Sequence, residues 1–316
     1  MSLTQLTGKG FFVFSDPGGA KPVLTLAESL KDSLQEFRIV SDRQYNFFND
    51  FLVPVNNAPS NAAAELVVFK PDFLFTGTSY TSSVELEYIK AAKELSIYSF
   101  AFVDHWTNIR ERFQRNGKEY LPDKILVIDE KAKQLAIGNG IDEDKLIVFG
   151  NPYHNFLKNW KPVLTKAELF QKLGLDDLQK KIVLYAPDPL SNVDGINTFG
   201  FDEIMATKIL VKTIKELGDK FYFLLNPHPN QNVEMLESLG GNEMRILPAG
   251  TDVNMIIYYA DVVIGFFSSL LIEAGIINRP VIRFFINDRV KDPLAGMNVG
   301  EIAYPETLVQ KLKAIL

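Results

Sequence analysis

The sequence predicts an α/β protein made of two doubly wound parallel-sheet domains, and three observations support this fold class. Short apolar segments of strand length alternate with longer segments whose apolar residues recur at helical spacing. The alternation runs along nearly all of the 316 residues, a length that suits about two domains. A break at Gly150-Asn151-Pro152 interrupts the pattern before it starts again. We therefore expect one domain over residues 1–155 and a second over residues 156–316.

The first half begins with an apolar run over residues 9–15 that ends at Asp16-Pro17-Gly18-Gly19, which is typical of a buried strand meeting a turn. The other strands expected in this half span residues 37–41, 73–75, 99–103, 124–128 and 146–149. Helices are expected over residues 22–34, 61–69 and 83–95. Strands that alternate with helices in this way form a parallel sheet covered on both faces.

The second half repeats the alternation. Its expected strands span residues 181–185, 221–225, 245–247, 262–264 and 281–284. Its expected helices span residues 203–217, 233–239, 253–259, 269–277 and 306–316. Residues 185–202 form the longest stretch without periodicity, and long loops of compact domains commonly carry function.

The composition excludes several classes of protein. The chain is 47% hydrophobic and 23% charged, an ordinary globular balance. Its net charge of −6 argues against binding to nucleic acid, which requires a basic surface. The absence of cysteine removes thiol catalysis, disulfides and zinc–thiolate sites. No apolar run reaches the ~18 residues of a transmembrane segment, and the first ten residues do not resemble a signal peptide, so we expect a cytoplasmic protein.

Polar residues cluster directly after the expected strands, at the edge where open parallel sheets bind ligands. These residues are Asp16, Thr78, Ser79, Asp104 and His105 in the first half, and Asp188, His228, Ser268 and Ser269 in the second. Turns and helix caps use the same residue types. The glycines after Asp16 lack the spacing of a dinucleotide-binding fingerprint, so no such cofactor is expected.

Residues 260–274 form the strongest candidate for a binding site. Ser268 and Ser269 stand where a strand turns into a helix, and the first amides and the dipole of a helix attract an anion. Ser269 and Glu273 are four residues apart and share one helix face. The serines would hold a phosphate and Glu273 a ribose. The alternative is a serine cap beside a solvated glutamate, but apolar residues flank Glu273.

The segment Asn226-Pro227-His228-Pro229-Asn230 is the second candidate. Its prolines fix the backbone around the histidine. An imidazole in this setting can donate to a phosphate oxygen or protonate a leaving phosphate, and the alternative is a turn histidine without a ligand. The three histidines of the chain lie far apart in sequence and form no pair with ligand spacing, so no metal site is expected.

With these residues the chain resembles glycosyltransferases of the GT-B type, in which two Rossmann-like domains face each other across a cleft. A His-Pro element at His228 followed by Ser268-Ser269 is similar to the pairing in bacterial sialyltransferases and CDP-glycerol glycerophosphotransferases. The run from Ser268 through Glu273 to residues 280–282 also resembles non-hydrolysing UDP-N-acetylglucosamine 2-epimerases. The resemblance implies that His228, Ser268 and Ser269 bind phosphate and that Glu273 binds ribose.

The sequence departs from the motifs of these families at two places, so the resemblance does not identify the nucleotide of the donor. The first half lacks the acidic-acidic-glycine triplet of the sialyltransferases, and Ser269-Leu270 replace the Gly-Gly pair that follows the epimerase serine. Cytidine and uridine nucleotides therefore both remain open.

The resemblance implies a metal-independent transferase that moves a sugar or a polyol phosphate from a nucleotide-activated donor in surface polysaccharide biosynthesis. An epimerase of UDP-N-acetylglucosamine and a catalytically silent nucleotide or glycan binder remain alternatives. The partners implied are a nucleotide-sugar donor and a glycan or lipid-linked acceptor, with no further cofactor. The sequence does not decide the oligomeric state, and a homo-oligomer is one alternative.

Transfer to a hydroxyl needs a base, which the first half would supply because the second half binds the donor. Asp104 with His105 is the first choice, in which Asp104 orients and charges the imidazole, and Asp16 is the second choice. The alternative is that Asp104 and His105 only cap and turn.

The remaining expectations concern the acceptor. Trp106 would stack on a sugar ring, and Arg110 and Arg112 would hold an anionic acceptor. Backbone amides and hydroxyls would complete the pocket, with Glu85 contributing from the following helix. The pocket residues are Gly77, Thr78 and Ser79.

Overall fold

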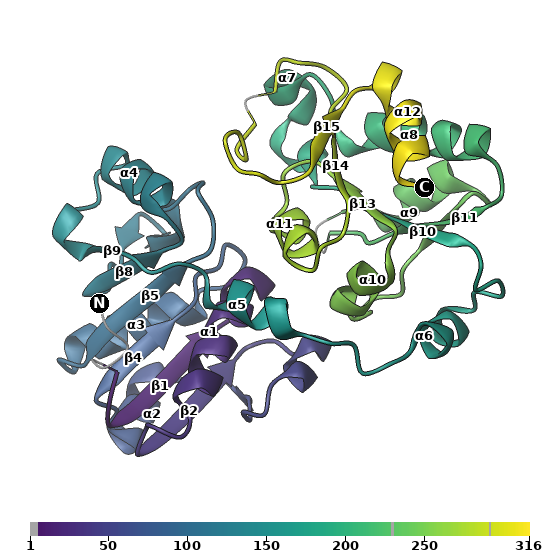
Figure 1. The fold of residues 1–316 in the computed structure, drawn as a ribbon. Helices are drawn as coiled ribbons and strands as arrows, with labels where there is room; N and C mark the ends of the chain where they lie inside the picture. The colour runs from purple at the N-terminus through teal and green to yellow at the C-terminus, as the bar shows by residue number, and fades with distance from the viewer. Residues whose placement is uncertain (1–5, 229–230, 291) are drawn as a thin grey trace. The chain divides into compact units, whose positions relative to one another are not determined.

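The computed structural model describes residues 6–228, 231–290 and 292–316. The chain divides into two compact units, with the division between Phe156 and Leu157 (Figure 1). Each unit is built on one parallel sheet with helices against it, so the predicted α/β class with two Rossmann-like sheets is confirmed.

The first unit has a seven-stranded sheet in the order β3-β2-β1-β4-β5-β8-β9, in which every paired strand is parallel. Its strands are β1 (Lys9–Phe14), β2 (Glu36–Ser41), β3 (Asn56–Asn57), β4 (Phe73–Thr76), β5 (Tyr98–Val103), β8 (Lys124–Val127) and β9 (Leu146–Val148). A small antiparallel hairpin of β6 (Gln114–Arg115) and β7 (Lys118–Glu119) stands apart from the sheet.

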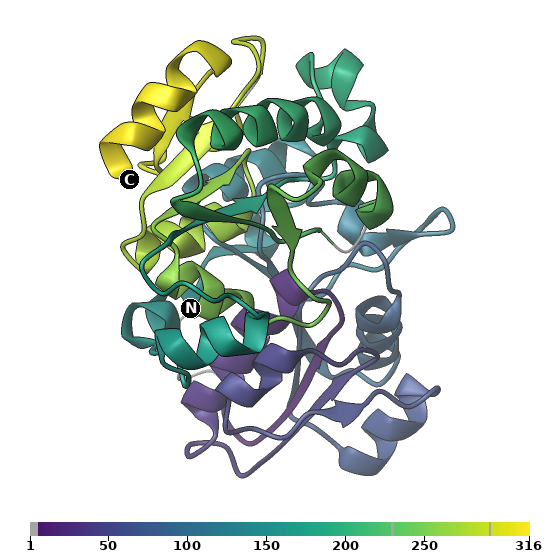
Figure 2. The ribbon, with the colours of Figure 1, turned by 90° about the vertical axis from the view of Figure 1, so that its right-hand side faces the viewer.

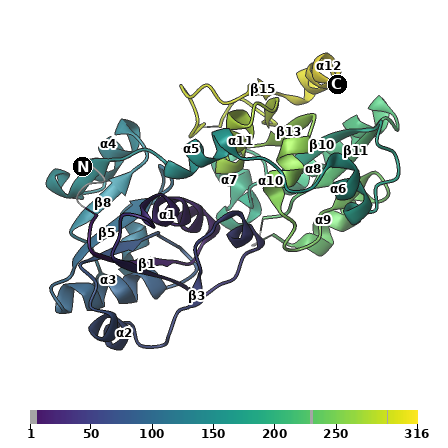
Figure 3. The same ribbon diagram turned by 60° about the horizontal axis from the view of Figure 1, so that its bottom comes forward.

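The helices of this unit cover both faces of the sheet. They are α1 (Pro17–Leu30), α2 (Ala62–Phe69), α3 (Val84–Glu94), α4 (Glu130–Gly138) and α5 (Pro152–Asn159, which crosses the division), with short 3₁₀ turns at Asn46–Asp50, Glu111–Phe113 and Glu143–Lys145. Figure 3 shows α1 on one face and α2 and α3 on the other. From Phe11 to Phe14, β1 is apolar because both of its faces are buried there: Phe11, Phe12 and Phe14 have no exposed surface.

The second unit has a six-stranded sheet in the order β12-β11-β10-β13-β14-β15, again parallel throughout. Its strands are β10 (Lys181–Ala186), β11 (Phe221–Leu225), β12 (Met244–Ile246), β13 (Val262–Gly265), β14 (Val281–Phe284) and β15 (Glu301–Ala303). Its helices are α6 (Lys166–Leu173), α7 (Gly195–Phe199), α8 (Glu203–Leu217), α9 (Val233–Gly240), α10 (Val253–Tyr259), α11 (Ser269–Ile276) and α12 (Pro305–Ile315), with a 3₁₀ turn at Leu190–Val193.

Helices α8 and α12 lie side by side over one face of the second sheet (Figures 1 and 2). Leu210 and Ile214 of α8 and Leu308 and Leu312 of α12 join the same apolar cluster as Ile264 on β13. This core holds the strands in register and fixes where their carboxyl ends stand.

In both sheets the strand order reverses at the first strand of the unit. The reversal falls between β1 and β4 in the first sheet and between β10 and β13 in the second. Helices on either side of such a point leave toward opposite faces of the sheet, so the loops at the carboxyl ends frame a binding crevice. The candidate site of each unit is therefore expected at these loops.

Helix α1 begins earlier than the sequence predicted. Asp16-Pro17-Gly18-Gly19 is not a free turn, since Pro17 already opens the helix. The glycines serve close packing instead: a Cβ built on Gly18 would lie 2.0 Å from Asp104 Oδ2, and one on Gly19 would lie 3.0 Å from Thr78 N and 3.1 Å from Gly77 Cα. The missing side chains let the first turn of α1 press against the loops after β4 and β5.

We expect Gly19→Ala to destabilise the protein by about 1–3 kcal/mol, because backbone atoms that cannot rotate away occupy the space of the new methyl group. Gly138→Ala is the matched control, since nothing lies within 4 Å of the added Cβ at the end of α4. Urea denaturation followed by circular dichroism measures both variants. Equal stability of the two would contradict the close approach of α1 to the β4 loop.

Candidate functional site

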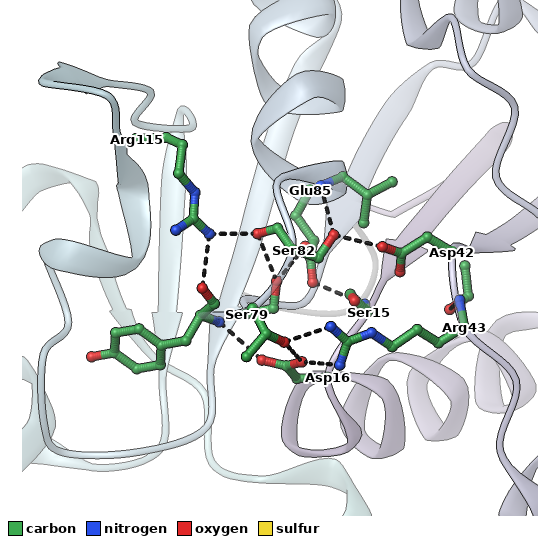
Figure 4. A network of polar contacts seen from close by, with 12 residues as sticks. Ser15, Asp16, Asp42, Arg43, Ser79, Ser82, Glu85 and Arg115 are labelled. Carbon is green, nitrogen blue, oxygen red and sulfur yellow. Dashed lines mark hydrogen bonds and ion pairs between the residues drawn. The ribbon is translucent and has the colours of Figure 1, made fainter. Parts of the chain in front are cut away.

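Asp16, which follows β1, lies at the centre of a polar network (Figure 4). Its Oδ1 accepts hydrogen bonds from Arg43 Nη1 at 2.8 Å and from Thr81 Oγ1 at 2.7 Å, and its Oδ2 accepts from the Tyr80 backbone N–H at 2.9 Å. Both oxygens are thus occupied by donors of the protein itself. A carboxylate held in this way suits anchoring of the loop after β4 better than proton abstraction.

Glu85, on α3, lies at the same edge of the sheet, below the loops that follow β1 and β4. It is 2% exposed, and its carboxylate accepts from the Ser15 backbone N–H at 2.9 Å and from Ser79 Oγ at 2.8 Å (Figure 4). Burial raises the pKa of Glu85 to about 7, and the hydrogen bonds from Ser79 and Ser15 offset only part of that effect. Glu85 therefore joins the end of β1 to the loop after β4 at the reversal point.

Asp104 pairs with Arg112. Arg112 Nη1 donates to Asp104 Oδ1 at 3.0 Å and to Thr78 Oγ1 at 3.3 Å, and the side chains of Arg112 and Asp104 are only 9% and 15% exposed. The other Asp104 oxygen lies against Gly18 in the first turn of α1, where the helix dipole favours a negative charge. Asp104 is thus anchored to Arg112 and α1, and the expected hydrogen bond that orients His105 is not made.

His105 is instead oriented by Thr107. Its Nδ1 lies 2.9 Å from Thr107 Oγ1 and 3.3 Å from the Thr107 backbone N. Burial lowers the pKa of His105; the Asp104 charge opposes this shift and the Arg112 charge adds to it. The Thr107 N–H donates to Nδ1, a bond that leaves the ring proton on Nε2. In the other tautomer Nδ1–H donates to Thr107 Oγ1 in place of that longer bond, and Nε2 has a lone pair that can accept a proton from a hydroxyl.

Trp106 and Arg110 do not occupy the positions that their predicted roles require. Trp106 is 5% exposed and donates its indole N–H to Asp129 Oδ2 at 2.8 Å, so it offers no open face for a sugar ring. Arg110 donates to Glu119 Oε1 at 2.7 Å and to the Asn139 carbonyl at 3.1 Å, at the end of α4. Of the two predicted arginines, the structure brings Arg112 to the edge with Asp104 and places Arg110 with Glu119.

The predicted pocket of Gly77, Thr78 and Ser79 is also internally bonded. The Gly77 N–H donates to the Val13 carbonyl at 2.8 Å as an extension of the sheet. The Thr78 hydroxyl donates to the Phe102 carbonyl at 3.2 Å, and the Ser79 hydroxyl is held by Glu85. These groups shape the loop, and the Gly77 amide is not available to a ligand.

Arg43 and Arg115 complete the network and were not among the residues predicted from the sequence. Arg43 follows the end of β2 by two residues. The rule that polar residues directly after strands are site candidates would therefore have predicted it. Arg115 lies in the β6–β7 hairpin and donates to the Tyr80 and Ser82 carbonyls at 3.0 and 2.6 Å (Figure 4). A two-residue strand has no periodicity, so no sequence pattern pointed to Arg115.

In the second unit, Ser268 is the N-cap of α11. Its Oγ accepts from the Leu270 N–H at 3.3 Å, and the Phe267 N–H donates to Asp188 Oδ2 at 3.2 Å. Burial raises the pKa of Asp188 to about 6, against the opposing effect of the Phe267 and Ser268 N–H groups. Ser269 is half-buried at the start of the same helix.

Glu273 is 6% exposed on α11 and is therefore not a solvated surface glutamate. Its ribose-binding role stays a prediction, but the structure removes the alternative of an open polar face.

His228, which follows β11, is exposed, and its backbone N–H donates to Gln231 Oε1 at 2.7 Å. Gln231 Nε2 in turn donates to the Pro187 carbonyl at 3.3 Å, next to Asp188. Gln231 is a third residue, after Arg43 and Arg115, that was not predicted from the sequence. Pro229 and Asn230 of the predicted proline-flanked element lie outside the described residues.

Within residues 6–228, 231–290 and 292–316, no three acidic or histidine side chains gather in a way that would hold a metal ion. Over the same ranges, every helix is too short or too polar to span a membrane.

One family model matches more than half of the chain, and two teichoic acid enzymes are similar to it in sequence. The model of the CDP-Glycerol:Poly(glycerophosphate) glycerophosphotransferase family matches residues 105–291, more than half of the chain. A teichoic acid glycerol-phosphate primase of Staphylococcus aureus is 24% identical over 217 residues, which is 67% of this chain and 53% of that protein. A teichoic acid poly(ribitol-phosphate) polymerase of Bacillus spizizenii is 26% identical over 174 residues, 54% of this chain and 27% of that protein.

Among solved structures, the chain is similar to UDP-GlcNAc 2-epimerase from Neisseria meningitidis bound to UDP-GlcNAc. The TM-score is 0.66 at 15% sequence identity, covering 96% of this chain and 90% of that one. This likeness shows the GT-B-type fold. The chain spans about half, or less, of the length of the two teichoic acid enzymes, so their complete activities do not transfer with the match.

The raised pKa of Glu85 predicts a pH-dependent stability. Because its folded-state pKa of about 7 exceeds the ordinary 4.5, the folded protein binds more protons between these values and loses stability as the pH rises through them. The free energy of unfolding of the wild type minus that of Glu85→Gln should fall by roughly 3 kcal/mol from pH 4.5 to 7 and then level off. Urea denaturation at a series of pH values measures it.

Glu87→Gln, at an exposed glutamate of the same helix, is the matched control and should follow the wild type across the pH series. A difference for Glu85→Gln that stays constant over the series would refute the buried, titrating carboxyl.

Proposed function

Because the chain belongs to the CDP-glycerol:poly(glycerophosphate) glycerophosphotransferase family, we propose that it transfers a polyol phosphate from a cytidine-diphosphate-activated donor to a hydroxyl group during synthesis of a cell-surface polymer. The names of both teichoic acid relatives, a glycerol-phosphate primase and a poly(ribitol-phosphate) polymerase, support this class of donor. A glycan or lipid-linked acceptor and a cytoplasmic site of action are part of the proposal.

One observation supports the proposed transfer most directly. The family match over residues 105–291 contains the residues proposed here for the base and for the donor, which are His105, His228, Ser268, Ser269 and Glu273. Asp16 and the loop after β4 lie outside the match. The matched part is therefore the part to which the transfer chemistry is assigned.

The proposed step is a substitution at phosphorus. An acceptor hydroxyl oxygen attacks the distal phosphorus of the donor, a new P–O bond forms, and the bond from that phosphorus to the bridging oxygen breaks to release CMP. The hydroxyl proton passes to Nε2 of a His105 ring that carries its own proton on Nδ1, facing Thr107 Oγ1. His228 donates a proton or a hydrogen bond to the phosphate of the departing CMP.

The donor would be held by the second unit. Ser268 and Ser269 stand at the N-terminus of α11, where hydroxyls and the helix dipole offset phosphate charge, and Glu273 would accept the ribose hydroxyls. We propose that the transfer needs no metal, because these fixed donors and the imidazole act where charge develops on the leaving phosphate.

The test is CMP release from CDP-glycerol. We expect release that depends on a glycerol-phosphate-terminated acceptor, and a loss of about 10²–10⁴-fold in turnover for His105→Gln with CMP binding retained. A parallel incubation with UDP-GlcNAc and no acceptor tests the epimerase alternative. Epimer formed in that incubation would refute the transferase, and equal turnover of His105→Gln would remove His105 from the reaction.

Glu273→Gln should weaken CMP binding by about 1–3 kcal/mol, because the neutral amide replaces a charged acceptor of the ribose hydroxyls. Isothermal titration calorimetry measures the affinity. Glu237→Gln, at an exposed position of α9 in the same unit, is the matched control and should bind as the wild type does. If both variants bind CMP equally well, Glu273 does not contact the nucleotide.

A further inference from the structure

The three loops that carry the proposed donor-binding residues are tied together by side chains with no role assigned so far. These loops follow β10, β11 and β13. Asp188 stands between Pro187 and Pro189 in the first of them, and its Oδ2 accepts the Phe267 N–H of the third at 3.2 Å. Phe267 immediately precedes Ser268, so this bond fixes the backbone at the point where the serine pair begins.

Gln231 makes the second connection. It is 9% exposed, and its Oε1 accepts the His228 N–H at 2.7 Å while its Nε2 donates to the Pro187 carbonyl at 3.3 Å. Its backbone N–H also donates to the His228 carbonyl at 2.9 Å. The His228 backbone is thereby fastened to the residue before Asp188.

We propose that Asp188 and Gln231 are positioning residues that set the placement of His228 relative to the serine pair, and with it the affinity of the second unit for a phosphate-bearing donor. This inference rests on the proposed function, which assigns His228, Ser268 and Ser269 to the donor phosphate. Neither Asp188 nor Gln231 needs to touch the donor. Both act through the backbone of the loops that do.

The physical basis is the rigidity of the Pro187-Asp188-Pro189 segment. Two prolines fix the backbone angles on either side of Asp188, so its carboxylate is delivered to the loop after β13 at little cost in conformational entropy. A hydrogen bond from an N–H to a charged acceptor is about twice as strong as a neutral one. The Phe267 N–H already donates to Asp188, so it does not donate to a phosphate at this edge. The phosphate would be bound by the serine hydroxyls and His228, and their positions then decide the affinity for the donor.

The same geometry would give the opposite effect on donor affinity if Asp188 opposed binding. If Asp188 acted as an internal anion that competes with the donor phosphate, its removal would strengthen binding. If it acted only on stability, its removal would lower the melting temperature and leave the affinity of the folded protein unchanged.

The experiment uses Asp188→Asn, Asp188→Ala and Gln231→Met in the full chain. Asp194→Asn, at an exposed position in the same long loop, is the matched control. Amide hydrogen exchange of the unliganded protein reports the positioning directly: we expect faster exchange at Phe267 in Asp188→Ala and at His228 in Gln231→Met. The control should match the wild type at both amides.

Affinities for CMP and for inorganic pyrophosphate are then measured by calorimetry. We expect Asp188→Ala and Gln231→Met to bind both probes roughly tenfold more weakly, the effect of losing one hydrogen bond that holds the site. Asp188→Asn retains an acceptor oxygen and should lose less. Unchanged or tighter binding, or unchanged exchange at Phe267 and His228, overturns the inference.

The two probes separate this inference from the proposed function. A wild-type protein that binds pyrophosphate but not CMP contradicts the cytidine donor, and the variants then decide the positioning role on pyrophosphate alone. A wild type that binds neither probe overturns both proposals.

Discussion

A carboxylate that accepts a backbone N–H group joins the two central loops of each sheet, and the rest of each site depends on it; Glu85 is buried and Asp188 is half-buried. Glu85 holds the Ser15 N–H in the first unit, and Asp188 holds the Phe267 N–H in the second. The strand order reverses between the strands that these loops follow, so each bond fixes the spacing of the two loops that frame the expected crevice. Burial raises the pKa of Glu85 to about 7 and of Asp188 to about 6, which shows that desolvation opposes the charge that makes these bonds strong.

The pairing of charges at the first sheet decides which group is left for proton transfer. Asp16 is engaged by Arg43, and Asp104 by Arg112, each through a direct ion pair. Both carboxylates therefore act as anchors for their loops. His105 is held through Nδ1 by Thr107, and burial lowers its pKa, which favours the neutral ring. The structure assigns Asp104 to its ion pair with Arg112, so in the proposed function the base role would fall on the His105 imidazole alone.

The fold class could be predicted because periodicity is local: an apolar run followed by a helix describes each βα unit whatever surrounds it. The position of the polar residues directly after strands could be predicted for the same reason, while their roles stay predictions. The predictions that the structure does not support concern residues whose contacts are with partners distant in sequence. Gly18 is small because Asp104 occupies its side-chain space. Trp106 is buried because Asp129 receives its N–H, and Arg110 is engaged because Glu119 faces it. No local pattern carries such information.

The charge of the chain explains why placement would matter so much at the second sheet. With a net charge of −6, the protein does not attract an anionic donor at long range, and physiological salt screens charges beyond about 8 Å. In the proposed function, affinity for a phosphate would then come from short-range groups: hydroxyls, an imidazole and the end of a helix. Such contacts weaken steeply when donor and acceptor shift by a few tenths of an ångström or tilt out of line. By the proposed positioning role, the bonds of Asp188 and Gln231 would hold these groups within that tolerance, and two side chains that need not touch the donor would still decide how tightly it binds.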